Sequence, residues 1–225
     1  FRSGCGRVVV VGPSAVVGPC VQMCSSATGC VLPLDQAHEV DPIGAADRVR
    51  MLDASLQAWV IGPGVGTPPW LDGMINALIT GSGPPLVLDA DALRCLARLE
   101  PSALLACQRA LVLTPHPGEF DRLAEAWSLP ISSGDQECRV GAASAMAAAC
   151  SALVVLKGHQ TVVADGEGHT WICDAGGPEL ATGGTGDVLA GLVAGLIAQR
   201  QDQDVASIVC LGVALHVNIF KLHVD

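Results

Sequence analysis

The sequence predicts an α/β protein in which a mostly parallel central sheet is flanked by helices, and two observations carry this prediction. The first is a set of short runs that are apolar throughout, as expected for strands covered on both faces. These runs are GRVVVVG at 6–12, AWVIG at 58–62, PLVLDA at 85–90, ALVLT at 110–114 and ALVVLK at 152–157. The second is that helical stretches separate most of them, at about 70–80, 91–99, 118–127 and 135–150. Strands that alternate with helices form parallel sheets.

The pattern changes after Lys157. Two short strands, TVVAD at 161–165 and HTWICD at 169–174, are joined by a glycine-containing turn. Such a pair forms a hairpin, which we expect at the margin of the sheet. Two further helices, at about 186–200 and 203–222, complete the predicted domain.

The length of the chain favours a single domain over residues 1–225. Because Phe1 stands directly before a strand pattern, we expect this domain to be truncated at its N-terminus. The formal net charge of −10 argues against an extended nucleic-acid surface, so any phosphate is expected to bind locally.

The cysteines and the apolar runs indicate a cytoplasmic protein that does not enter a membrane. The ten cysteines form no CxxC pair, and most lie in apolar runs, so we interpret them as reduced thiols. The first residues lack the features of a signal peptide. The longest apolar run, 205–220, is interrupted by His216 and Asn218 and is too short to span a bilayer.

The stretch ATGGTGDVLAGLVAGLIAQ at 181–199 places three glycines before an aspartate at the start of a helix. A helix N-terminus presents unpaired N–H groups and a positive partial charge, and glycines let a phosphate come close to them. The pattern therefore predicts an anion site with the Asp187 carboxylate beside it. The alternative is a glycine turn in which Asp187 only caps the helix.

Polar residues also follow the predicted strands, as GPGVG, DAD, PHPGE and KGHQT. Each has an ordinary explanation as a turn, a cap or a solvated lysine. In parallel sheets, however, ligands bind beyond the carboxyl ends of the strands. We therefore expect these four segments to meet at one functional edge.

These motifs resemble a known family. The segments GPGVG, LVLDADAL, LTPHPGEFDRL, VVLKGHQTVVADGEG and LATGGTGDVLAGLVAGLIAQ occur in the order found in the ADP- or ATP-dependent NAD(P)H-hydrate dehydratases of the ribokinase-like superfamily. The resemblance covers about residues 58–220. It implies a ribokinase-like three-layer sandwich, and a repair reaction that uses a nucleotide phosphate to remove water from hydrated NADH or NADPH (NADHX or NADPHX).

The resemblance also implies roles for particular residues. Asp187 would be the catalytic base and would contact the substrate, together with Gly66 and His116. The nucleotide would be bound by two segments, which comprise Lys157, Gly158, His159, Gln160, Thr161, Gly184, Thr185 and Gly186.

Further partners follow from the same resemblance. ADP or ATP would be the co-substrate, with Mg²⁺ as cofactor, although the metal ligands are unknown. An NAD(P)H-hydrate epimerase would be a functional partner, and we expect a homo-oligomer. Asp89 and Asp91 are interpreted either as positioning a metal-bound water or a ribose, or as caps, and Glu119 as favouring a helix start.

The segment GPSAVVGPCVQMCSSATGC departs from the family pattern, because Pro13 and Pro19 stand in unexpected places. We therefore assign no substrate contacts to residues 18–27. Two other functions remain open: a small-molecule kinase of the same superfamily, and a nucleotide-binding scaffold without turnover.

Overall fold

The computed structural model describes residues 4–134 and 136–221. Within them the strands form a two-stranded sheet, β1-β2, and a six-stranded sheet in the order β3-β4-β5-β6-β7-β8. Strands β3 to β6 are parallel, whereas β7 and β8 are antiparallel to their neighbours. The strands are β1 (Val8–Gly12), β2 (Ala27–Val31), β3 (Trp59–Ile61), β4 (Leu86–Leu88), β5 (Leu111–Leu113), β6 (Leu153–Leu156), β7 (Thr161–Ala164) and β8 (Thr170–Cys173).

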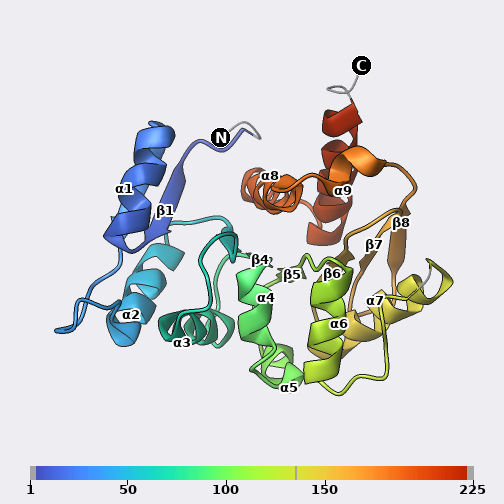
Figure 1. The fold of residues 1–225 in the computed structure, drawn as a ribbon, viewed down its shortest axis with the longest axis horizontal. Coiled ribbons are helices and arrows are strands. Elements are labelled where there is room, and N and C mark those ends of the chain that lie inside the picture. Colours follow the sequence, from blue (N-terminus) through green and yellow to red (C-terminus); the bar gives the residue numbers. More distant parts are fainter. Residues whose placement is uncertain (1–3, 135, 222–225) are drawn as a thin grey trace.

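Helices cover both faces of the larger sheet, so the fold has three layers (Figure 1). One face carries α3 (Pro69–Ile79), α4 (Asp91–Leu96), α5 (Pro101–Leu105), α6 (Pro117–Ala126) and α7 (Gln136–Cys150). The other face carries α8 (Thr185–Gln199) and α9 (Val205–Lys221), which follow a short 3-10 turn, η1 (Pro178–Ala181). Across residues 4–134 and 136–221, every helix is too short or too polar to cross a membrane.

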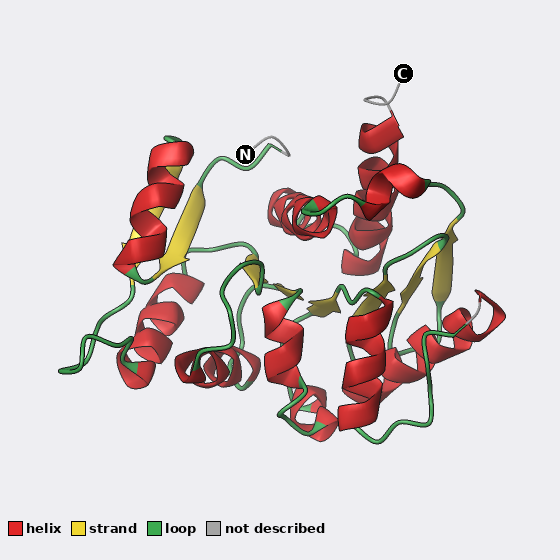
Figure 2. Cartoon of the chain, in the orientation of Figure 1, coloured by secondary structure: helices red, strands yellow, loops and turns green. Residues whose placement is uncertain are grey.

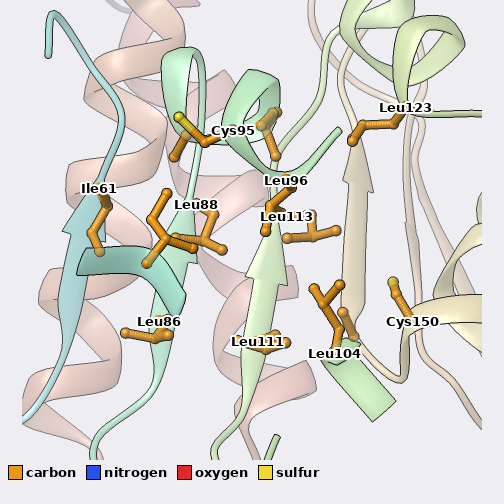
Figure 3. Packing of buried hydrophobic residues seen from close by; sticks show 14 of the residues in the cluster. Ile61, Leu86, Leu88, Cys95, Leu96, Leu104, Leu111, Leu113, Leu123 and Cys150 are labelled. Carbon is orange, nitrogen blue, oxygen red and sulfur yellow. The ribbon is translucent and has the colours of Figure 1, made fainter. Parts of the chain in front are cut away.

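Alternation along the central strands explains the two hydrophobic cores. Leu86 and Leu88 of β4 pack into the core beneath α3 to α7, whereas Val87 packs against α8 and α9. The neighbouring β5 repeats the pattern because Leu86, Val87 and Leu88 pair in register with Leu111, Val112 and Leu113. Figure 3 shows the first core, where the strand leucines meet Cys95 and Leu96 of α4. Strands buried on both faces are apolar at every position, as the sequence predicted.

The predicted parallel strands, the hairpin and the three-layer α/β class are confirmed. The N-terminal part differs from expectation. The run GRVVVVG was predicted among the strands of the main sheet, but it pairs with β2 in a separate small sheet, visible apart from the central strands in Figure 2. Gly29 of β2 lets the connecting helix α1 (Ser14–Met23) pack closely on this small sheet, because a Cβ there would lie 2.6 Å from Val17.

The proline-containing segment forms an ordered helix. Pro13 is the N-cap of α1, where its fixed φ suits a helix start, and Pro19 lies inside the helix. The structure also contains α2 (Pro42–Asp53), which the sequence analysis did not predict.

Candidate active site

The carboxyl ends of β3, β4, β5 and β6 lie at one edge of the sheet because these strands are parallel. The residues that follow them are Gly62–Gly66, Asp89, His116 and Lys157. The start of α8 joins this edge through Gly186, as described below. The prediction that the four polar segments meet is confirmed, because the segment after β3 contacts the segment after β4, and Lys157 contacts both Asp89 and Glu119.

A buried ion pair forms the centre of this edge. The Lys157 Nζ atom lies 2.8 Å from Oδ1 of Asp89, whose side chain is only 1% exposed. Glu119 provides a second carboxylate, with Oε2 at 4.0 Å from the same ammonium group. Attraction between such groups is strong because little water screens them. Asp89 therefore fixes the direction of the lysine side chain.

Gly186 brings the first turn of α8 onto this ion pair. A Cβ at position 186 would lie 3.2 Å from Lys157 Nζ and 3.8 Å from Oδ2 of Asp89. The absence of a side chain thus leaves room between the ammonium group and the helix start. A phosphate placed there would meet a lysine and a helix N-terminus together.

Thr185 does not present its hydroxyl to this space. Its Oγ1 lies 2.8 Å from the carbonyl oxygen of Leu180 and 2.9 Å from that of Thr182. Gly184, the N-cap, has a φ of +89°, which turns the chain into the helix. The predicted nucleotide role of Thr185 is therefore limited to its backbone, and the side chain holds the preceding turn in place.

The N–H groups of Gly186 and Asp187 have no acceptor among the described residues. The Asp187 carboxylate is exposed, and within residues 4–134 and 136–221 it forms no hydrogen bond or ion pair. Asp187 lies in the first turn of α8 without capping it, since the N-cap is Gly184. The capping alternative for Asp187 is therefore wrong, and its carboxylate is available to a ligand.

His116 and Glu119 form a capping box at the start of α6. The His116 Nδ1 atom accepts hydrogen bonds from the N–H groups of Gly118 and Glu119, at 3.1 and 3.3 Å. Glu119 Oε2 accepts from the His116 N–H at 2.9 Å. Because Nδ1 is an acceptor, the neutral ring carries its proton on Nε2, and the ring is half exposed. Glu119 thus does more than favour the helix start, since it also faces Lys157.

The segment from Lys157 to Thr161 turns the chain from β6 into β7. Thr161 is buried, and its hydroxyl donates to the carbonyl of Gly158 at 3.1 Å. Gln160 donates through its side chain to Asp174. His159 is exposed. Of the side chains predicted to bind nucleotide, that of Lys157 lies at the site edge and that of His159 is exposed to solvent. The side chains of Gln160 and Thr161 form hydrogen bonds within the protein.

Arg139 of α7 supports the same segment and was missed in the sequence analysis. Its Nη2 atom donates to the carbonyls of Leu156 and Lys157, at 3.1 and 2.9 Å, and its Nη1 to that of His159 at 3.4 Å. Burial lowers the pKa of the guanidinium group from its ordinary value. A signal was present, because Arg139 is the last charged residue before Lys157 in a long apolar and small-residue stretch.

Gly66 lies at the exit of β3, where its N–H donates to Oδ2 of Asp91 at 2.9 Å. Asp91 also lies 3.6 Å from Arg94 in the same helix. Its carboxylate is therefore used locally, which favours the structural interpretation of Asp91 over a metal or ribose role. The contact places Gly66 beside the start of α4.

His216 of α9 is a second residue that the sequence analysis did not identify. It is buried, and its Nε2 atom lies 2.8 Å from the carbonyl oxygen of Thr185. Burial lowers the pKa of His216, the bond to Thr185 raises it, and the nearby positive charge of Lys157 lowers it further. His216 thus connects α9 to the first turn of α8.

At the site edge, the described residues form no group of three or more potential metal ligands. Among the described residues, the grouped potential ligands are Asp165, Glu167 and His169, in the turn between β7 and β8. Because β7 runs antiparallel to β6, that turn lies at the opposite edge of the sheet. Asp89 and Glu119 are already engaged by Lys157 and by the His116 N–H. Mg²⁺ at this edge would depend mainly on oxygens of the nucleotide itself.

Comparison with known proteins places this geometry in a family. A model of the NAD(P)H-hydrate dehydratase family matches residues 1–222. The chain is 38% identical over 206 residues to the bifunctional NAD(P)H-hydrate repair enzyme Nnr of Synechocystis. The matched region covers 91% of this chain and 36% of that enzyme. It is also 38% identical over 164 residues to the ADP-dependent (S)-NAD(P)H-hydrate dehydratase of Neisseria meningitidis, covering 72% of this chain and 53% of that protein.

Comparison with solved structures leads to the same family. The ADP/ATP-dependent NAD(P)H-hydrate dehydratase from Bacillus subtilis, co-crystallized with ATP/Mg²⁺, superposes with a TM-score of 0.73 at 30% identity, over 96% of this chain and 70% of that one. A ribokinase-like superfamily protein from Enterococcus faecalis superposes with a TM-score of 0.74 at 23% identity, over 97% of this chain and 69% of that one. At this identity the similarity supports the fold alone. The chain spans 34% to 44% of the length of five bifunctional relatives. By its match over nearly the whole sequence, the chain belongs to the NAD(P)H-hydrate dehydratase family.

Proposed function

We propose that this protein uses ADP or ATP to dehydrate NADHX or NADPHX and so restores NADH or NADPH. The observation that carries the proposal is the meeting, at one sheet edge, of Lys157, the N–H groups of the α8 N-terminus and the Asp187 carboxylate, the latter two without partners in the described part of the chain. This arrangement combines an anion site with a base, as phosphoryl transfer to a hydroxyl requires. The names of the relatives from Neisseria meningitidis and Bacillus subtilis support the choice of substrate and nucleotide.

In the first step, the hydroxyl oxygen on the hydrated nicotinamide ring attacks the terminal phosphorus of the nucleotide. The bond from that phosphorus to the bridging oxygen breaks, and the shortened nucleotide departs. Asp187 accepts the proton that the hydroxyl loses. The exposed carboxylate suits this role because a substrate can reach it.

Lys157 and the N–H groups of Gly186 and Asp187 would stabilise the charge on the transferring phosphoryl group. Asp89 positions the lysine, which lies against Gly186. Lys157 would therefore contact the transferring phosphoryl group itself, within its predicted role in nucleotide binding. The remaining backbone of residues 158–161 and of 184–185 would contact the rest of the nucleotide.

In the second step, the phosphorylated ring loses inorganic phosphate. Phosphate leaves far more readily than hydroxide, so the carbon–oxygen bond breaks with assistance from the ring nitrogen lone pair. Loss of a proton from the adjacent carbon then restores the ring double bond. Gly66 and His116, both at the same sheet edge, would hold the hydrated dinucleotide.

Two further components belong to the proposal. Mg²⁺ would enter with the nucleotide, where it neutralises phosphate charge. An NAD(P)H-hydrate epimerase would be the functional partner, which agrees with relatives that are named bifunctional repair enzymes.

The test is to incubate the purified protein with NADHX, Mg²⁺ and either ADP or ATP while following reduced-nicotinamide absorbance and nucleotide consumption. Dehydration predicts that both change together. Nucleotide consumption on other small alcohols, without recovery of absorbance from NADHX, would instead establish a kinase. Nucleotide binding without consumption would establish a scaffold.

A further inference from the structure

Arg139 contacts the KGHQT segment from behind. Its guanidinium group reaches from α7 to the carbonyls of Leu156, Lys157 and His159, as described above. The residue is 9% exposed, and no described carboxylate pairs with it. Its Nε atom is buried without a hydrogen-bond partner. A buried cation without a counter-ion is costly, so its neighbours must compensate through oriented carbonyl dipoles.

The segment that Arg139 contacts has an unusual backbone. Gly158 has a φ of +149° and Gln160 a φ of +55°, so two of its residues lie outside the region favoured by L-amino acids. The hydroxyl of Thr161 closes this turn with one bond to Gly158. Arg139 adds three contacts, to the carbonyls of Leu156, Lys157 and His159, which lie on either side of Gly158.

Gly158 and Arg139 are matched in space. A Cβ at position 158 would lie 2.6 Å from Nη1 and 2.7 Å from Nη2 of Arg139. Any side chain at this position would therefore displace the guanidinium group or shift the turn. The glycine is needed for the approach of the arginine as well as for its φ.

We propose that Arg139 is a positioning residue for nucleotide binding, which holds the backbone of residues 157–159 so that the Lys157 ammonium group faces Asp89 and Gly186. Arg139 acts through this backbone, because it contacts the side of the segment that faces away from the ligand. The inference rests on the proposed function, because it assumes that residues 157–161 bind ADP or ATP.

The experiment compares Arg139→Lys and Arg139→Met with Arg109→Lys as a matched control. Arg109 is also buried and also donates to backbone carbonyls, those of Gly81, Ser82 and Pro84, but it lies at the opposite edge of the sheet. Dissociation constants for ADP and ATP are measured by calorimetry, below the unfolding temperature of each variant. The KM for NADHX is measured separately.

We expect Arg139→Met to weaken nucleotide binding by about tenfold, because a loop displaced by about 1 Å misplaces its contacts. Arg139→Lys should recover part of the loss, since one ammonium group can reach fewer carbonyls than the guanidinium fork. The KM for NADHX should stay within about twofold. Arg109→Lys should lower the unfolding temperature while nucleotide affinity stays unchanged.

Gly158→Ala provides a second test. It should weaken nucleotide binding by itself, and the double variant Gly158→Ala, Arg139→Met should lose less affinity than the sum of the two single losses, because both changes disturb the same contact while the strain at position 158 adds separately. Fully additive losses would overturn the inference, as would wild-type nucleotide affinity in the folded Arg139→Met variant. Absence of nucleotide binding by the wild-type protein would overturn the proposed function as well.

Discussion

Two charged clusters lie at opposite edges of the same sheet, and they differ in how completely their hydrogen bonds are used. At the amino edge, Arg109 binds both carboxylate oxygens of Asp53, at 3.0 and 2.7 Å, as well as three backbone carbonyls. Trp59 donates to the same carboxylate. At the carboxyl edge, Lys157 makes a single short contact to Asp89 and faces the bare backbone of Gly186.

The difference separates an ion pair whose donors are used within the protein from one that keeps donors for a ligand. Arg109 has few donors left, so its cluster stabilises the loops before β4 and β5 and offers little to a ligand. Lys157 retains donors beside a helix N-terminus, where an anion can use them. A buried charge alone therefore does not mark a site; what distinguishes Lys157 is that its unused donors lie beside a helix N-terminus.

The largest effect is expected on stability, from Arg109→Met. Removing one partner of a buried ion pair leaves the Asp53 charge uncompensated and should cost about 3–5 kcal/mol in the free energy of unfolding. Urea denaturation measures this loss. Nucleotide affinity of the folded fraction should not change, and a large drop in that affinity would contradict the separation of the two clusters.

Asp187→Asn should lower kcat by about a hundredfold or more, since it removes a general base. The side chain is exposed, so stability and nucleotide affinity should stay nearly unchanged. Asp202→Asn, an exposed aspartate in the turn between α8 and α9, is the matched control and should retain full turnover. Near-normal turnover of Asp187→Asn would exclude Asp187 as the base.

Lys157→Ala should weaken ADP or ATP binding by about tenfold or more, because it removes a charged donor to phosphate. Binding of NADHX should be less affected. The change also leaves Asp89 buried without its partner, so stability should fall. The double variant Lys157→Ala, Asp89→Asn should recover part of the stability but not the affinity. Equal losses for both ligands in the double variant would place Lys157 outside the nucleotide subsite.

The smallest effect is expected from His216. Burial lowers the pKa of His216 below its ordinary value of 6.5, so the unfolded chain binds this proton first as the pH falls. The stability contributed by neutral His216 is therefore fully present above 6.5 and is lost as the pH falls through the folded pKa. Urea titrations of wild type and His216→Gln should show a flatter pH dependence in the variant. Identical slopes below 6.5 would contradict this assignment.

The fold was largely predictable because its central strands are buried on both faces and therefore appear as continuous apolar runs. Strand β2 was not predictable in this way, since its sequence ATGCV has one buried residue and no apolar run. The start of helix α2 was predictable from the sequence, because Asp41 stands directly before Pro42. In the structure, the Asp41 side chain accepts from the N–H groups of Ile43 and Gly44. An N-cap aspartate followed by proline is typical of a helix start.

The candidate site was predictable only in part. The motifs identified the segments at the sheet edge, because each follows a strand. They could not predict that Lys157 pairs with Asp89, since the two lie 68 positions apart and meet only through the strand order. Nor could they show that the hydroxyl of Thr185 turns away from the site, because that depends on the carbonyls of the preceding turn.

The burial of β4 and β5 on both faces has a consequence for ligand binding. Residues such as Leu88 and Leu113 lie within dense packing, so the strand ends have little freedom to move. The side chains that follow them are therefore already ordered before a ligand arrives. A nucleotide that binds at this edge would restrict few additional backbone torsions, and less of its binding energy would be offset by lost conformational entropy.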